Sequence, residues 1–386
     1  MKISMLDPSL FTGRYDDALC DAIGRAANTV TLHARPMRGT DAIAPANYRY
    51  ERRFFRLSEH LRGSVGEGAP FRALKAGDYL ASALFGDLSA LTASDVVHLQ
   101  WLPFPAADAT MLRRLLAVPG RPALVHTVHN ASAFHGDGGS QGRGYRALLD
   151  RFDALIVHGE TTRAALLAQG VGSDRLHVVP HPPMALAQAG VEDLASVSAP
   201  LRPRVLFFGT IRLYKGFDLL IEACLALWLS GVDFELAVAG KPFMDVAPLL
   251  DRVRKEGFAD RLLTDLGFLT EPRLDAHLRK ADILVFPYRD IDSSGAFLSA
   301  LHYGKAVVAS RVGMFAGLDE RGVALVDPGD SEALGNMLER LLADEGRRRA
   351  LGNGALAMHA ELGTWDEAAG TTLAVYEEAI RRGGAE

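Results

Sequence analysis

A chain of 386 residues is too long for one compact core, and its length predicts two domains. The composition, 48% hydrophobic and 23% charged, is that of an ordinary globular protein, and the formal net charge of −5 disfavours nucleic acid as a partner. Cys20 and Cys224 lie in apolar helical patterns in different halves. They predict neither a disulfide framework nor a zinc site, as expected in a reducing cytosol.

The first half alternates short apolar runs with helical patterns. Residues Met1–Asp7 read as a strand rather than as the core of a signal peptide. No window approaches the ~20 apolar residues of a membrane span. The predicted strands are 2–6, 29–33, 96–100, 123–128, 154–158 and 176–179. Helical patterns lie between them, which predicts a parallel sheet covered on both faces.

The segment 47–75 differs from its surroundings. Its cations are Arg49, Arg52, Arg53, Arg56, Arg62, Arg72 and Lys75, against Glu51, Glu59 and Glu67. Aromatic residues are interleaved at Tyr48, Tyr50, Phe54, Phe55 and Phe71. Two interpretations stay open: an exposed helical hairpin with a solvated basic face, or a surface for anionic lipid next to a lipid-linked acceptor.

The second half repeats the alternation of strands and helices. Its predicted strands are 205–208, 234–239, 261–266, 283–287, 306–310 and 323–326. Prolines are dense between the halves, from Pro180 to Pro203, and they break both helix and strand. We therefore predict an α/β protein with a first domain at 1–185, a linker at 186–203 and a second domain at 204–363. Both domains are predicted to be doubly wound and Rossmann-like, with ligands beyond the carboxyl ends of the strands.

An anion site is predicted where the strand 205–208 ends. Gly209 stops the strand, Arg212 and Lys215 follow, and a helical pattern begins after Gly216. Free backbone N–H groups and the helix dipole favour negative charge at such a turn. The arginine adds a fork that suits phosphate oxygens. A βα corner with two solvated cations is the alternative.

Two stretches carry a resemblance to a known family. Residues 209–216, Gly-Thr-Ile-Arg-Leu-Tyr-Lys-Gly, resemble the donor-phosphate motif of GT-B enzymes of the glycosyltransferase family 4 type. Residues 287–295, Pro-Tyr-Arg-Asp-Ile-Asp-Ser-Ser-Gly, and 304–309, Gly-Lys-Ala-Val-Val-Ala, are similar to a second segment of the same family. The resemblance implies the GT-B fold, with two domains facing across a cleft. It also implies that the last helix, 364–386, crosses back to the first domain.

The resemblance also implies how the donor is bound. Arg212 and Lys215 would meet the charge that develops on a diphosphate leaving group. The small residues at 293–295 would let backbone N–H groups approach the distal phosphate. The implied donor-binding residues are Gly13, Gly209, Thr210, Gly216, Phe268, Leu269, Asp292, Ser293, Ser294, Gly295 and Ser299.

The candidate residues of the first domain lie at strand ends. His129, in Thr127-Val128-His129, matches the family histidine that meets the donor sugar near the reacting carbon. A satisfied core or loop histidine is the alternative. His98 and Glu160 are candidates for the acceptor side. His126 and His129 are three residues apart on a strand, so alternation aims them at opposite faces and no metal site is expected.

The chain departs from the family at the donor sugar and ribose. Many members carry two glutamates eight residues apart, but this chain has Ser299 at the second position and only Asp292 near the first. Thr210 replaces an arginine that members often place after the first glycine. The nucleotide, UDP or GDP type, and the sugar therefore stay open.

The predicted function is metal-independent transfer of a sugar, with retention, from a nucleotide sugar to a hydroxyl of a glycan or lipid-linked oligosaccharide. No cofactor is expected, and no nucleic acid. The predicted location is cytoplasmic, and 47–75 is predicted to contact anionic membrane peripherally. The alternatives are a sugar-nucleotide epimerase and a non-catalytic sugar-nucleotide-binding partner. An NAD protein would need a Gly-x-Gly-x-x-Gly turn after a strand, which neither half shows.

Overall fold

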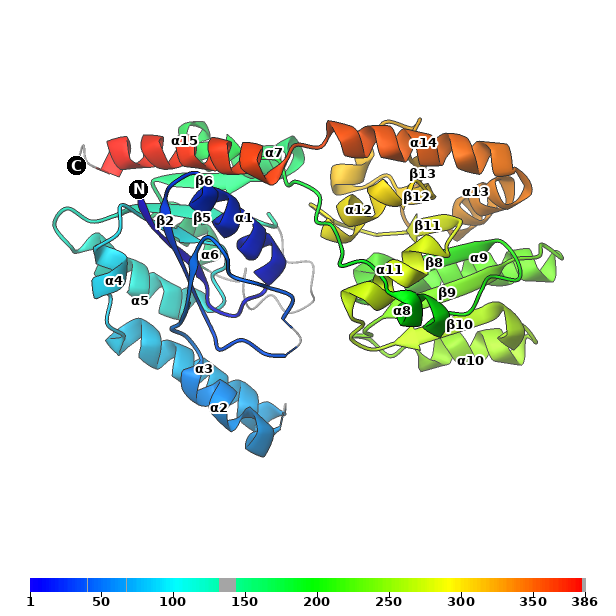
Figure 1. Cartoon of the computed structure of the whole chain (residues 1–386), viewed down its shortest axis with the longest axis horizontal. Helices are drawn as coiled ribbons and strands as arrows, with labels where there is room; N and C mark the ends of the chain where they lie inside the picture. Colours follow the sequence, from blue (N-terminus) through cyan, green and yellow to red (C-terminus); the bar gives the residue numbers. More distant parts are fainter. Residues whose placement is uncertain (40, 67, 132–143, 384–386) are drawn as a thin grey trace. The chain divides into compact units, whose positions relative to one another are not determined.

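The computed structural model describes residues 1–39, 41–66, 68–131 and 144–383. The chain divides into two compact units (Figure 1). Unit 1 is Met1–Pro182 together with Gly363–Glu386, and unit 2 is Pro183–Leu362. The final helix, α15 (Trp365–Gly383), therefore belongs to the same unit as the first strands, and it packs on helix α1 (Gly13–Arg25).

Unit 1 has a fully parallel sheet of seven strands in the described residues, in the order β3-β2-β1-β4-β5-β6-β7. The strands are β1 (Lys2–Asp7), β2 (Thr29–Ala34), β3 (Arg49–Arg52), β4 (Val96–Leu99), β5 (Ala123–Thr127), β6 (Ala154–Val157) and β7 (Leu176–Val178). The further helices are α2 (Arg56–Val65), α3 (Ala69–Phe85), α4 (Ser89–Thr92), α5 (Pro105–Leu116), α6 (Tyr145–Leu149) and α7 (Glu160–Ala168). Strands β4, β5 and β6 are buried along their whole length, which explains their unbroken apolar sequences.

Unit 2 has a second fully parallel sheet, in the order β10-β9-β8-β11-β12-β13. Its strands are β8 (Arg204–Phe208), β9 (Glu235–Gly240), β10 (Leu262–Leu266), β11 (Ile283–Phe286), β12 (Ala306–Ser310) and β13 (Ala324–Val326). Its helices are α8 (Val191–Ser196), α9 (Phe217–Leu229), α10 (Ala247–Lys255), α11 (Glu271–Arg279), α12 (Gly295–Ala300), α13 (Ser331–Ala343) and α14 (Glu345–Glu361). Two parallel sheets with interleaved helices confirm the predicted α/β fold class.

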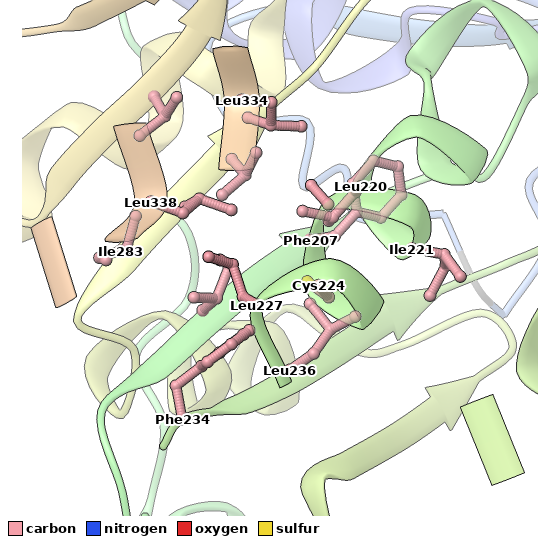
Figure 2. Packing of buried hydrophobic residues seen from close by; sticks show 14 of the residues in the cluster. Phe207, Leu220, Ile221, Cys224, Leu227, Phe234, Leu236, Ile283, Leu334 and Leu338 are labelled. Atoms are coloured by element: carbon pink, nitrogen blue, oxygen red, sulfur yellow. The ribbon is translucent and has the colours of Figure 1, made fainter. Parts of the chain in front are cut away.

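The core of unit 2 packs one face of α9 against the sheet and against α13 (Figure 2). Phe207 of β8 meets Phe217 at the start of α9, with ring centroids 5.2 Å apart. Cys224 lies in this core and Cys20 in unit 1, both fully buried and unpaired. Burial raises the pKa of both thiols, so they behave as small apolar side chains.

The segment 186–203 was predicted to be a linker, but the structure places it in unit 2. It contains α8, and its backbone is held by α11: Ala187 N–H donates to Glu271 and Ala189 N–H to Asp275, each at 2.8 Å. The prolines therefore correctly indicated a segment without strands, but this segment is packed on unit 2 and is not a linker between the units.

The segment 47–75 also differs from the simple hairpin that its pattern suggests. Residues Arg49–Arg52 form the edge strand β3 before α2 and α3 begin. The aromatic residues Tyr48, Phe54, Phe55 and Phe71 are buried, whereas the cations Arg49, Arg52, Arg56 and Arg72 are exposed. In the part of the chain that the structure describes, no helix is both long and apolar enough to cross a membrane.

Candidate active site

The two motifs of unit 2 converge at the carboxyl ends of β8 and β11. Strand β8 ends at Phe208, and Gly209 turns the chain with a φ of +93°. A short 3₁₀ turn, Leu213–Lys215, then leads into α9 through Gly216, which has a φ of +66°. Only glycine fits at Gly216, because a Cβ there would lie 1.9 Å from the carbonyl oxygen of Pro287. The backbone of the second motif at Pro287 therefore packs directly against that of the first motif at Gly216.

The residues after Pro287 also contact the first motif. The ring of Tyr288 lies beneath Lys215, with Nζ 5.2 Å from its centroid. Arg289 forms two hydrogen bonds of 2.7 Å to the carboxylate of Asp218, one to each oxygen. It also donates to the carbonyl oxygen of Leu213 at 3.0 Å. The ion pair and the backbone contact fix the turn that carries Lys215.

Lys215 is a buried cation at the centre of this turn. Its side chain is 7% exposed, and no ion pair to it exists among the described residues. Burial lowers the pKa of Lys215, and the charge of Arg212 lowers it further. A Cβ on Gly209 would lie 3.5 Å from Nζ, so the ammonium group lies directly beside this glycine. A buried ammonium group without a counter-ion is suited to receive an anion.

Arg212 belongs to a stack of alternating cations and aromatic rings. Its guanidinium carbon lies 4.3 Å from the centroid of Phe243. Lys241 Nζ lies 5.2 Å from the same ring and 4.0 Å from the ring of Phe268. Phe243 and Phe268 are 48% and 70% exposed, so the stack stands at the surface. Cation–π contacts of this kind hold the flexible side chains in place.

The other predicted donor-binding residues lie around the same strand ends. Ser294 is buried and caps α12, since its Oγ accepts from Phe297 N–H at 3.3 Å. Asp292 and Ser293 precede it and are half-buried. Gly295 begins α12, and a Cβ there would lie 3.1 Å from Met184.

Ser299, Leu269 and Thr210 have different surroundings. Ser299 is 5% exposed on α12, inside unit 2. Leu269 is partly buried and packs against the core cluster that includes Phe286 and Phe297. Thr210 is half-buried and directly follows Gly209.

In unit 1, His129 follows β5 and is 9% exposed. Its Nε2 lies 3.0 Å from Gln100 Oε1, and its Nδ1 lies 3.3 Å from His158 Nε2. Trp101 stacks on the imidazole, with centroids 4.9 Å apart and an interplanar angle of 7°. Burial, together with the neighbouring His158 and His181, lowers the pKa of His129 well below its usual value. The imidazole is therefore neutral near pH 7.

The partners of His129 come from successive strand ends. Gln100 follows β4, His158 follows β6 and His181 follows β7. Tyr15 of α1 packs on all three histidines, with centroids 5.0–5.3 Å apart. The predicted strands 96–100 and 154–158 end at Gln100 and His158, but neither residue, nor His181, was among the predicted site residues. All three residues follow apolar runs that form strands, and this shared position could have predicted that they lie at the same edge of the sheet.

The other predicted residues of unit 1 make different side-chain contacts. His98 is fully buried, and its nitrogens lie 2.7 Å from Tyr376 Oη and 2.8 Å from Thr127 Oγ1, as in a satisfied core histidine. The Glu160 side chain is 75% exposed and pairs with Arg163 at 3.3 Å. Gly13 begins α1, next to Thr12, whose Oγ1 accepts a hydrogen bond of 2.9 Å from Trp101 Nε1.

No group of three or more His, Cys, Asp or Glu side chains in the described ranges is arranged to hold a metal ion. His126 and His129 have separate partners: His126 Nε2 lies 3.0 Å from Tyr145 Oη, while His129 contacts Gln100 and His158. At the strand ends of unit 2, Arg212, Lys215 and Lys241 supply positive charge.

Comparison with known proteins gives matches over both units. The family described as Glycosyltransferase Family 4 matches residues 12–182, and the family described as Glycosyl transferases group 1 matches residues 202–344. A D-inositol 3-phosphate glycosyltransferase of Xylanimonas cellulosilytica is 32% identical over 286 residues, which are 67% of this chain and 67% of that protein. The lipopolysaccharide core biosynthesis mannosyltransferase LpcC of Rhizobium leguminosarum is 30% identical over 54% of this chain and 60% of that protein.

The solved structures agree in fold. HepE of Anabaena, in complex with UDP-glucose, matches with a TM-score of 0.68 and 15% identity over 100% of both chains. Together with the two family matches, this similarity confirms the predicted architecture. The chain therefore belongs to the GT-B glycosyltransferases of the family 4 type and is a glycosyltransferase.

Proposed function

We propose that this glycosyltransferase transfers a hexose from a nucleoside-diphosphate sugar, of UDP or GDP type, to a hydroxyl group of a glycan or lipid-linked oligosaccharide. The observation that carries the proposal is the burial of Lys215 at the carboxyl end of β8, where this cation forms no ion pair with any residue that the structure describes. The relatives are named as an inositol phosphate glycosyltransferase and a mannosyltransferase, and the HepE structure contains UDP-glucose. These names support a hexose and a nucleotide donor.

The chemistry follows from where charge develops. Breaking the bond between the sugar and the diphosphate leaves negative charge on the diphosphate, and fixed cations aimed at it lower the barrier. Arg212, held against Phe243, supplies a bidentate donor, and Lys215 supplies a point charge. An arriving diphosphate favours the charged form of Lys215, opposing the effect of burial on its pKa.

His129 is the candidate in unit 1 for binding a hydroxyl group of the donor sugar. Its lowered pKa keeps the ring neutral, so it acts as a hydrogen-bonding partner rather than as a cation. Trp101 and Gln100 fix the plane and the rotation of the ring. A fixed neutral imidazole is suited to a hydrogen bond with a sugar hydroxyl group.

Metal independence and retention are part of the proposal. Arg212 and Lys215 supply the positive charge that a divalent cation supplies to the diphosphate in other transferases. The sequence offers no carboxylate clearly placed as a nucleophile, which suits substitution on the front face of the sugar. Retention would be read directly from the anomeric proton signals of the product.

A cytoplasmic location and peripheral contact with anionic membrane through 47–75 also belong to the proposal. The support for membrane contact is the set of exposed cations Arg49, Arg52, Arg56 and Arg72. Tyr48, Phe54, Phe55 and Phe71 are buried, so we assign the attraction to the exposed cations, and it would weaken with salt.

The test begins with calorimetric titration of the full chain with UDP, GDP, ADP and CDP. We expect one nucleotide to bind and Lys215→Ala to weaken it. The corresponding radiolabelled hexose donors are then incubated with a glycan extract and without it. Label that enters glycan supports transfer. Conversion of the donor to another sugar nucleotide without glycan would instead identify an epimerase.

A further inference from the structure

A pocket in unit 1 has no part in the donor chemistry described above. It has a volume of about 800 Å³, within the range of small-molecule sites. Residues from the loop after β2, from β3 and from α2 line it. Helix α2 packs beside α3 (Figure 1). We call this cavity the basic pocket, because four arginines and a histidine line it: Arg38, Arg52, Arg56, Arg62 and His60.

The two acids that line the basic pocket do not balance these cations. Glu59 accepts a hydrogen bond of 2.9 Å from Arg38 Nε, and Arg62 lies 3.5 Å from the same carboxylate. Glu51 lies 3.2 Å from Nδ1 of the buried His33. Within the described ranges, neither Arg52 nor Arg56 has an ion pair, and both are exposed to the pocket and solvent. The pocket therefore carries a net positive charge.

The surroundings of Glu59 show the same excess of positive charge. Burial favours its protonated form, but hydrogen bonds from Arg38 and the charges of Arg35 and Arg62 hold the pKa of Glu59 below its ordinary value. Lys75 lies nearby, with Nζ 4.7 Å from the ring of Phe55. Burial, and next the charge of Arg38, lowers the pKa of Lys75 although Glu59 opposes the shift. One carboxylate thus faces several cations, and a further anion would relieve their repulsion.

We propose that the basic pocket binds a phosphate dianion carried by the acceptor. Two unpaired guanidinium groups match the charge and the oxygen geometry of a phosphate monoester better than those of a single carboxylate. The pocket is larger than a phosphate group alone. Met37, which is 48% exposed, supplies an apolar wall for the group to which the phosphate is attached.

The position in the sheet fits an acceptor site, and this step rests on the proposed function. The pocket lies near the ends of β2 and β3, and His129 follows β5. Three strand spacings, from β2 through β1 and β4 to β5, separate the two places by about 14 Å. An acceptor that reaches both places must carry its phosphate away from the reacting hydroxyl. The phosphate can come from a soluble phosphorylated glycan or from a lipid headgroup.

The first arm of the test uses inorganic phosphate as the probe. Calorimetric titrations are run on the full chain carrying Lys215→Ala, so that the donor site contributes little. We expect phosphate to bind, and the added pair Arg52→Ser and Arg56→Ser to weaken it at least tenfold. The control pair, Arg49→Ser and Arg72→Ser, removes the same charge from exposed positions that do not line this pocket. Equal loss in both pairs, or no binding at all, would overturn the proposal.

A conservative variant tests whether weaker binding results from misfolding rather than from loss of the guanidinium groups. Replacing Arg52 and Arg56 by lysine keeps the charge and loses the fork, and we expect intermediate affinity with an unchanged melting temperature. Full affinity in the lysine variant would refute the bidentate geometry on which the assignment of phosphate depends.

The second arm identifies the source of the phosphate. Sedimentation with vesicles containing phosphatidic acid, compared with neutral vesicles, shows whether a headgroup enters the pocket. Binding that Arg52→Ser and Arg56→Ser abolish, and that the control pair keeps, assigns a lipid source. Phosphate binding without vesicle binding assigns a soluble source. Titration of the natural chain with the donor nucleotide separates the proposed function from the basic-pocket proposal. Loss of nucleotide binding would contradict the proposed function, whereas loss of phosphate binding alone would contradict only the basic pocket.

Discussion

Arg289 and Asp218 join the two motifs of unit 2 through a bidentate ion pair with both contacts at 2.7 Å. The two residues lie 71 positions apart in the sequence. Asp218 is in the first turn of α9, and Arg289 directly follows Tyr288, over which Lys215 is placed. The pair therefore determines where the ammonium group of Lys215 stands, although neither residue is one of the cations assigned to the diphosphate.

The first prediction concerns this ion pair. Arg289→Ala and Asp218→Asn should each weaken nucleoside-diphosphate binding, because the turn of Lys215 loses its anchor. The double variant should be scarcely weaker than either single variant, with a coupling energy within about 0.5–3 kcal/mol. A titration cycle of the four proteins measures it. Arg321→Ala, which removes an exposed ion pair with Asp319 in the same unit, is the control and should leave binding unchanged.

The second prediction concerns the cations themselves. Lys215→Ala and Arg212→Ala should each lower nucleoside-diphosphate affinity by about 1.5–3 kcal/mol, the typical cost of one charge-assisted contact. Far-ultraviolet circular dichroism should stay unchanged. Lys255→Ala and Arg252→Ala on the exposed face of α10 are matched controls. If all four variants bind equally well, Arg212 and Lys215 are not the phosphate ligands.

Much of this site follows from the sequence, because parallel strands buried on both faces are nearly continuous apolar runs. Such runs located β4, β5 and β6 and the glycine turn after β8. Strand β3, Arg-Tyr-Glu-Arg, has no such run: it lies at the edge of the sheet, and backbone pairing with β2 forms it.

Contacts across the sheet could not be predicted in the same way. The order β1-β4-β5-β6 places Gln100, His129 and His158 side by side. Strand order depends on pairing between distant segments, so the sequence of one segment does not reveal it. Lys241 directly follows the glycine that ends β9, which was a readable signal. Its partner Phe268 comes from a different strand end, so the stack appears only in three dimensions.

The third prediction concerns pH and stability in unit 1. Asp108 is buried near the start of α5, where Tyr79 Oη donates to it at 2.5 Å and Phe104 N–H at 2.9 Å. Burial raises the pKa of Asp108 to about 7. A carboxyl group with a raised pKa stabilises the fold below its unfolded pKa. This contribution is lost as pH rises through about 7, by at most about 1.4 kcal/mol per pH unit.

Asp108→Asn removes this titration. Between pH 4.5 and 7.5, the natural chain should lose stability through Asp108, so the unfolding free energy of the variant should increase relative to that of the natural chain. Urea unfolding at four pH values measures the difference. Glu377→Gln, an exposed neutralisation in the same unit, should run parallel to the natural chain. A parallel course for Asp108→Asn as well would show that Asp108 is ionised throughout.

The fourth prediction concerns metal ions. Transfer should proceed in excess EDTA, with the initial rate within about twofold of the rate with added magnesium or manganese, since basic side chains meet the diphosphate. The assay is run on protein that has been dialysed against chelator. A strict requirement for either ion would contradict the mechanism and would direct attention to carboxylates near the donor.

Helix α15 has a consequence for how the chain is made. Its Tyr376 bonds to His98 of β4, and Asp366 pairs with Arg25 of α1 at 2.6 Å, so unit 1 needs a helix that is translated after all of unit 2. Domains generally fold as units while the ribosome is still at work. Here the whole sequence of the inserted unit 2 is synthesised before α15, which packs on β5 and β6 of unit 1. Unit 1 is the first to begin synthesis and the last that can be completed.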